Sequence, residues 1–154
     1  MIIILEGPDG SGKTTLAEQL QKQTGYQLLH RVQPKTEEDK KRMMDEYVQV
    51  LRTGKNCILD RSWYSEMVYG PVMRDHSIIC YPQMYELERL TAKYGGIIIH
   101  CTAPESILWK RCLRRGEDYI TDRETFHKIC EGFDEIMHRV PHVIPVVTYE
   151  YKDL

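Results

Sequence analysis

Several features that would identify a class of protein are missing from this sequence. No apolar run approaches the roughly 20 residues that a membrane-spanning helix needs. The first residues, MIIILEGPDG, contain no basic segment of the kind that opens a signal peptide. We therefore expect a cytoplasmic protein without a membrane partner, and we interpret the apolar start as a buried strand.

Cysteine and histidine patterns typical of disulfide or zinc proteins are also missing. The five cysteines are odd in number and show no Cys-x-x-Cys spacing, and the six histidines show no His-Glu-x-x-His pattern. We expect reduced thiols that serve as small core side chains. The formal net charge of -2 gives no general attraction to nucleic acid, so we do not expect nucleic acid as a partner.

The 154 residues suffice for a single domain, 1–154, with a hydrophobic core. Strands are predicted at 2–5, 26–30, 56–60, 97–101 and 143–148, and helices at 14–23, 36–54, 81–94, 104–115 and 122–139. This alternation predicts an α/β fold, in which a parallel sheet carries helices on both faces. Ligands of such sheets bind beyond the carboxyl ends of the strands, so the residues that follow each strand are the candidates for function.

A phosphate-binding loop follows the first predicted strand, because Gly7 to Thr14 fits the pattern G-x-x-x-x-G-K-[ST]. Its glycines permit tight turns, and successive N–H groups with a helix N-terminus hold the anion. Lys13 is expected to contact the β- and γ-phosphates of ATP, and the Thr14 hydroxyl to bind Mg²⁺. The predicted ATP-binding residues of the loop are Gly7, Asp9, Gly10, Ser11, Gly12, Lys13, Thr14 and Thr15.

Asp60 and Arg61 stand at the end of the third predicted strand, NCILD. An acid at this position can hold Mg²⁺ through water or orient an attacking oxygen. The neighbouring arginine can bind a phosphate through two parallel hydrogen bonds. We predict a catalytic role for both and a metal-binding role for Asp60. A surface ion pair at a strand end is the alternative.

A basic helix end is predicted in the segment WKRCLRRGEDY. Arg111 lies within one helical turn of Arg114 and Arg115, and Gly116 then breaks the helix. Guanidinium groups stabilise the charge that spreads over a phosphoryl group in transfer, and closure over the nucleotide excludes water. We expect a short lid around 111–123. A solvated basic helix face is the alternative, and the sequence does not show which arginine points inward.

Further candidates for binding the second substrate are scattered along the chain. Arg31 follows the second strand, and Arg74 ends a segment from Tyr69 that we interpret as a turn. For each arginine a plain surface position is the alternative. Asp9 could accept a hydrogen bond from a sugar hydroxyl, or shape the loop as a turn residue. The predicted acceptor-binding residues are Asp9, Arg31, Arg61, Tyr64, Tyr69 and Arg74, with core packing as an equal alternative for Tyr64.

These motifs together resemble the thymidylate kinase-like P-loop kinases and their deoxynucleoside kinase relatives. EGPDGSGKTT is similar to the family loop, LDRSWYSE to its Asp-Arg motif, and RCLRRGEDY to its arginine-bearing lid. The resemblance spans nearly the whole chain, although 33–56 carry no family motif. It implies a five-stranded parallel sheet of order 2-3-1-4-5 and transfer of the ATP γ-phosphoryl group, with Mg²⁺, to a deoxynucleotide, commonly dTMP.

The resemblance also implies roles for individual residues. Asp9 would contact the acceptor's sugar hydroxyl, Asp60 would assist Mg²⁺, and Arg61 would hold the acceptor phosphate. Arg111 and Arg115 would belong to the lid, and we take both as catalytic, with Arg111 also binding ATP. Family members are often homodimers, so a homodimer is expected by analogy.

Two departures from the family leave the acceptor open. The chain is shorter than typical thymidylate kinases, and RSWYS is closer to the Arg-Ser segment of deoxynucleoside kinases. A nucleoside, another deoxynucleoside monophosphate or a modified pyrimidine is therefore an alternative acceptor. A module that only binds and hydrolyses nucleotide is a third hypothesis. Against it, no Asn-Lys-x-Asp or Thr-Lys-x-Asp motif reads guanine, and no Asp-Glu pair ends a strand.

Overall fold

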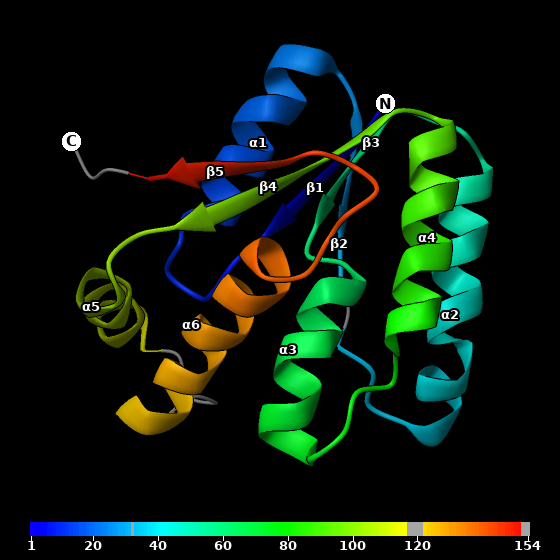
Figure 1. Ribbon diagram of the computed structural model, residues 1–154. Coiled ribbons are helices and arrows are strands. Elements are labelled where there is room, and N and C mark those ends of the chain that lie inside the picture. The colour runs from blue at the N-terminus through cyan, green and yellow to red at the C-terminus, as the bar shows by residue number, and fades with distance from the viewer. Residues whose placement is uncertain (32, 117–121, 152–154) are drawn as a thin grey trace.

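A five-stranded parallel sheet forms the centre of the molecule in a computed structural model that describes residues 1–31, 33–116 and 122–151 (Figure 1). The strands are β1 (Ile2–Glu6), β2 (Gln27–His30), β3 (Cys57–Asp60), β4 (Gly96–Thr102) and β5 (Val146–Glu150). Their order across the sheet is β2-β3-β1-β4-β5, and every neighbouring pair is parallel. The sheet order implied by the family resemblance is thus confirmed.

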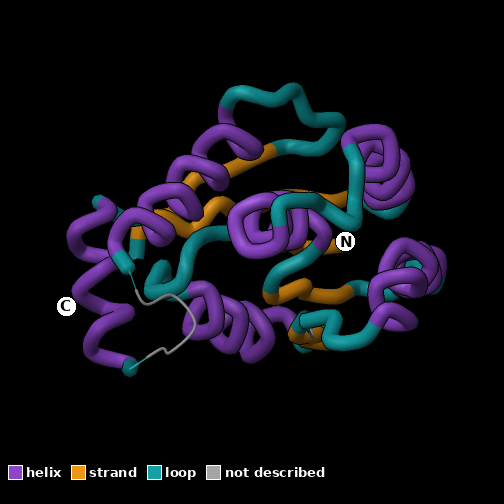
Figure 2. The backbone as a smooth tube through the Cα atoms, turned by 90° about the horizontal axis from the view of Figure 1, so that it is seen from below, coloured by secondary structure: helices purple, strands orange, loops and turns teal. Residues whose placement is uncertain are grey.

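Helices cover both faces of this sheet, as the alternating pattern predicts (Figures 1 and 2). They are α1 (Lys13–Thr24), α2 (Glu37–Arg52), α3 (Trp63–Arg74), α4 (Tyr81–Lys93), α5 (Glu105–Arg115) and α6 (Arg123–His138). Helix α1 covers one face, where Ala17 packs with Ile3, Leu5 and Ile58. The larger part of the core lies on the opposite face, under helices that include α3 and α6.

The central strand β1 is buried along its whole length because it has a neighbour on each side and a core on each face. Strand β5 is an edge strand, as Pro145 suggested, but it begins one residue after that proline and not at Val143. A proline lacks the N–H that a strand residue donates to its neighbour, so the strand starts beyond it. The carbonyl of Pro145 still accepts a hydrogen bond from the Ile98 N–H at 2.9 Å.

Helix α3 corrects the interpretation of 69–74 as a turn, because that segment is the second half of a twelve-residue helix. Gly70 and Pro71 are turn-forming residues in isolation. Here a Cβ on Gly70 would lie 2.4 Å from the Glu66 carboxylate and 2.7 Å from the His76 carbonyl oxygen. The glycine therefore allows a close approach of chain segments, and burial of α3 outweighs the helix-breaking tendency of Pro71.

In the described ranges, no helix combines the length and the apolar character that crossing a bilayer requires.

Candidate functional site

The phosphate-binding loop connects the end of β1 to the start of α1, at the carboxyl edge of the sheet. Gly7 has a φ of 152° and Gly12 a φ of 82°, which side-chain-bearing residues rarely adopt. A Cβ on Gly7 would lie 2.1 Å from the carbonyl oxygen of Cys101 in β4, so the loop packs directly on the neighbouring strand. Thr14 and Thr15 follow Lys13 in the first turn of α1, and Ser11 is fully buried within the loop.

Lys13 is buried and folds back over the loop. Its Nζ donates hydrogen bonds to the Pro8 carbonyl at 2.9 Å and to the Ser11 hydroxyl at 3.2 Å. Burial, together with the positive charge of Arg61, lowers the pKa of Lys13 to about 8. An incoming phosphate would offset both effects, because it brings negative charge to a desolvated ammonium group.

The Asp60 carboxylate faces the loop from the end of β3. Its Oδ2 accepts the Thr14 hydroxyl at 3.0 Å and lies 2.9 Å from Nδ1 of His30. A hydroxyl and a carboxylate side by side suit Mg²⁺, which binds hard oxygen ligands and keeps several waters. These residues can hold the ion that the fold family implies. The sequence missed His30, although its place at a strand's carboxyl end was a signal.

Arg61 follows Asp60 in a strained backbone conformation, with a φ of 71°. Its guanidinium donates to the Asp9 carboxylate at 2.8 Å and to the Ser65 hydroxyl at 2.9 Å. The Tyr69 hydroxyl donates to the other oxygen of Asp9 at 2.9 Å. The tyrosine ring also lies 5.0 Å from the guanidinium carbon. The structure therefore brings three predicted acceptor residues into one network across the loop.

Glu6 supports this network and was not predicted from the sequence. It is fully buried at the end of β1, and its carboxylate accepts hydrogen bonds from the N–H and hydroxyl groups of both Ser62 and Ser65. These residues lie at the N-terminus of α3, where a negative charge is favourable. Since Ser65 also accepts a bond from Arg61, Glu6 helps to fix the orientation of that arginine.

Arg31 and Arg74 converge on a second buried carboxylate, Glu66 in α3. Arg31 donates to it at 3.2 Å and Arg74 at 2.6 Å, and the N–H of Ile78 donates at 3.0 Å. The side chain of Arg31 is only 8% exposed, and its Nε has no hydrogen-bond partner among the described residues. Arg31 also lines the cavity over the phosphate loop, so other parts of its side chain border that site.

The basic end of α5 reaches the loop from the opposite side. Arg111 is buried and donates to the carbonyl of Gly10 at 3.1 Å and to that of Tyr151 at 2.9 Å. Arg115 lines the same cavity as the loop residues. Both predicted lid arginines thus lie near the loop, whereas the part of the predicted lid from 117 to 121 lies outside the described residues.

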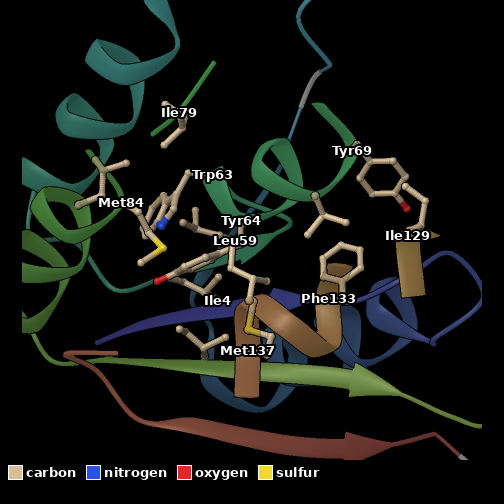
Figure 3. Close-up of a cluster of buried hydrophobic side chains, with 14 of the residues drawn as sticks. Ile4, Leu59, Trp63, Tyr64, Tyr69, Ile79, Met84, Ile129, Phe133 and Met137 are labelled. Atoms are coloured by element: carbon tan, nitrogen blue, oxygen red, sulfur yellow. The ribbon is translucent and has the colours of Figure 1, made fainter. Parts of the chain in front are cut away.

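Tyr64 does not reach this site. It is fully buried, and its ring packs 5.2 Å from that of Trp63 and 5.7 Å from that of His142, measured between centroids. Figure 3 shows it among the core side chains, with Leu59 and Met84 nearby. The first turn of α3 directs it into the core, so the structure favours the packing alternative over substrate contact.

Adjoining cavities connect these groups into one region. The cavity over the loop, of about 220 Å³, is lined by four basic residues, Lys13, Arg31, Arg61 and Arg115, and by the two carboxylates of Asp9 and Asp60. Its excess of positive charge suits an anion. A mostly apolar cavity of about 460 Å³ lies between β2 and α2, and a small one of about 190 Å³ borders Tyr69. Arg31 and Arg61 line all three.

A phosphate loop after the first strand of a parallel sheet of order 2-3-1-4-5 defines the P-loop kinase fold. The AAA domain family matches residues 3–130, and the chain belongs to this family. The chain is also similar to the SPbeta prophage-derived uncharacterized protein YorR of Bacillus subtilis (strain 168), with 31% identity over 137 residues. The aligned region covers 88% of this chain and 81% of that protein.

Solved structures share this fold. The crystal structure of YorR from Bacillus subtilis in complex with phosphorylated GDP superposes with a TM-score of 0.81 at 25% identity, over 97% of this chain and 85% of that one. The deoxyadenosine kinase of M. mycoides with bound dCTP superposes with a TM-score of 0.65 at 18% identity, over 97% and 90%. The latter likeness concerns the fold alone.

Proposed function

We propose that this protein transfers the γ-phosphoryl group of ATP to a deoxynucleoside monophosphate. The observation that carries the proposal is the position of Arg31 and Arg61, which line both the cavity over the phosphate loop and the apolar cavity beside it. A monophosphate held by these arginines would face the loop on one side, while its sugar and base would extend into the apolar cavity.

The donor side of the reaction is supported by the loop itself. Its N–H groups and the N-terminus of α1 would hold the β- and γ-phosphates, with Lys13 as the mobile positive charge. Thr14 and Asp60 would hold Mg²⁺, which neutralises charge between the β- and γ-phosphates when it is bound. Arg111 and Arg115 would complete the positive surroundings of the transferred group.

The acceptor side is supported by charge. Arg31 and Arg74 gather around Glu66, and Arg61 beside Asp9, so three guanidinium groups that can bind a phosphate lie near one another. In the transfer, an oxygen of the acceptor phosphate forms a bond to the γ-phosphorus as the bond to ADP breaks. This oxygen is already anionic near neutral pH, so the acceptor needs no general base.

Two observations on relatives bear on the choice between acceptors. YorR was crystallised with a phosphorylated guanine nucleotide, which is in keeping with a nucleotide as a ligand of this chain. The deoxyadenosine kinase shares the fold, and a nucleoside acceptor remains the second candidate function. A nucleoside would bring no phosphate to Arg31 and Arg61 in the cavity, and their positive charges favour the monophosphate.

An ATP-consumption assay tests the proposal. Purified protein with ATP and Mg²⁺ is offered dTMP, dUMP, dCMP, dGMP, dAMP, thymidine or deoxycytidine, and we expect turnover that depends on a monophosphate. Arg61→Ala should raise the acceptor KM about tenfold to hundredfold, because a guanidinium–phosphate contact is lost. Arg52→Ala, at the exposed end of α2, is the matched control.

The results separate the three hypotheses. Loss of ATP without any dependence on an acceptor would indicate a nucleotide-hydrolysing module. Turnover with nucleosides, together with an unchanged acceptor KM in Arg61→Ala, would indicate a nucleoside kinase and contradict the proposal.

A further inference from the structure

The apolar cavity beside the phosphate site has the size and lining of a nucleobase pocket. Its volume of about 460 Å³ lies in the range of about 300 to 1,000 Å³ that is typical of small-molecule sites. Leu29 and Leu59 contribute apolar surface from the sheet, and Met43, Tyr47 and Val50 contribute it from α2. A flat aromatic ring between such side chains would bury its faces and leave its edge for polar recognition.

One face of α2 forms the wall of this cavity. Asp39, Met43, Glu46, Tyr47 and Val50 all line it. Apart from the adjacent Glu46 and Tyr47 they are three or four residues apart, which places them along the same side of the helix. This side of the helix is therefore mostly apolar, and Asp39 and Glu46 contribute its two carboxylates.

The two carboxylates differ in the hydrogen bonds that they already accept within the protein. Asp39 completes the capping box of α2, accepting hydrogen bonds from the N–H groups of Lys35 and Thr36, both at 3.1 Å. Those bonds lower the pKa of Asp39, which stays ionised as part of the helix end. Glu46 is exposed to solvent and lines the cavity between Met43 and Val50.

The ion pairs on the described part of α2 do not involve Glu46. They join Lys40 to Glu37 and Arg42 to Glu38, one turn or more towards the N-terminus. The cavity is thus polarised, with guanidinium groups at the end shared with the phosphate site and a carboxylate on the wall formed by α2.

We propose that the acceptor's base is guanine and that Glu46 determines this specificity by binding its Watson–Crick edge. The inference rests on the proposed function, because it assigns a base to the acceptor of that reaction. An ionised carboxylate only accepts hydrogen bonds, and its two oxygens match two adjacent donors. Guanine presents such a pair, its ring N1–H and its exocyclic amino group.

The other bases match a carboxylate less well. Adenine and cytosine place a ring nitrogen acceptor next to their amino group, and that lone pair faces the second carboxylate oxygen. Thymine has a single N–H between two carbonyl oxygens, which a carboxylate repels. The base inferred from the cavity therefore differs from the thymine that the family resemblance implies.

Initial rates with dGMP, dIMP, dAMP, dCMP and dTMP at saturating ATP and Mg²⁺ test the inference. We expect the highest kcat/KM with dGMP. A lower value is expected with dIMP, which keeps the ring N–H but lacks the amino group. In Glu46→Gln the kcat/KM for dGMP should fall about tenfold to hundredfold, because a charge-assisted pair of hydrogen bonds is lost. The value for dTMP should rise relative to dGMP, since an amide both donates and accepts.

Asp45→Asn is the matched control, because it removes one carboxylate from the adjacent, exposed position of the same helix and does not line the cavity. Titration calorimetry of dGMP and dTMP against the wild type and both variants adds a readout that is independent of turnover. Thermal unfolding followed by circular dichroism checks that all variants are folded.

The outcomes are distinct from those of the proposed function. A preference of the wild type for dTMP or dCMP, or equal effects of Glu46→Gln and Asp45→Asn on dGMP, would overturn the guanine assignment while leaving monophosphate transfer intact. Absence of turnover with every monophosphate would overturn the proposed function, and the guanine assignment with it.

Discussion

Asp9 is a residue whose surroundings answer a question that its position in the phosphate loop raises. A carboxylate within an anion-binding loop is unfavourable unless it has partners of its own. Arg61 and Tyr69 supply them, so the negative charge of Asp9 is balanced where it borders the cavity over the loop. The sequence predicted that all three residues bind the acceptor, but it did not predict that they bind one another.

At the residue scale, we predict that Asp9→Asn raises the acceptor KM about tenfold, because the loss of one charge frees Arg61 from its fixed orientation. Tyr69→Phe keeps the ring and the charges and removes one hydrogen bond to Asp9, so it should raise the KM by about threefold at most. Steady-state kinetics with the acceptor varied measures both. If Asp9→Asn leaves the KM unchanged, Asp9 only shapes the loop.

The connection between β1 and α3 shows how elements distant in the sequence build the site together. Glu6 ends β1, and its carboxylate accepts four hydrogen bonds from the first turn of α3. Helix α3 was itself missed, because Gly70 and Pro71 are residues that local rules assign to turns. Local rules do not include the long-range burial that keeps this segment helical.

At the element scale, we predict that Glu6→Gln lowers the free energy of unfolding by about 2 to 4 kcal/mol, because a buried carboxylate with four donors is replaced by an amide that brings donors of its own. Urea unfolding followed by circular dichroism measures the change. Glu18→Gln, on the exposed side of α1, should change it by less than about 0.5 kcal/mol. Equal stabilities of the two variants would contradict a structural role for Glu6.

Across the whole molecule, the packing of α6 against the sheet places the exposed His138 beside the buried His100 of β4. The Nδ1 of His100 lies 2.9 Å from Nε2 of His138, and His100 is 1% exposed. Burial lowers the pKa of His100 to about 4, and the neighbouring His138 contributes to the shift. The folded protein therefore keeps this imidazole neutral at pH values where the unfolded chain protonates it.

At this scale, we predict that acidification from about pH 6.5 to about pH 4 costs folding stability through His100. Over this window the unfolded chain binds a proton that the folded protein does not, so unfolding becomes easier as the pH falls. A shift of this size corresponds to about 3 kcal/mol. Unfolding free energies from urea titrations at several pH values should depend less on pH in His100→Asn than in the wild type. His76→Asn, at an exposed position, should keep the wild-type slope, and identical slopes in all three proteins would exclude His100 as the cause.

The sequence by itself determined the phosphate loop, the alternation of strands and helices, and the strand ends at which functional residues gather. These features follow from local rules, because glycine spacing, runs of apolar residues and helix caps act over a few residues. The tertiary structure decided which of the candidate side chains meet. In the folded protein Arg31 and Arg74 pair with Glu66, Tyr64 lies in the core, and Glu46 lines a cavity. Such contacts join residues far apart in the chain, and they form only because α2 and α3 pack against the sheet.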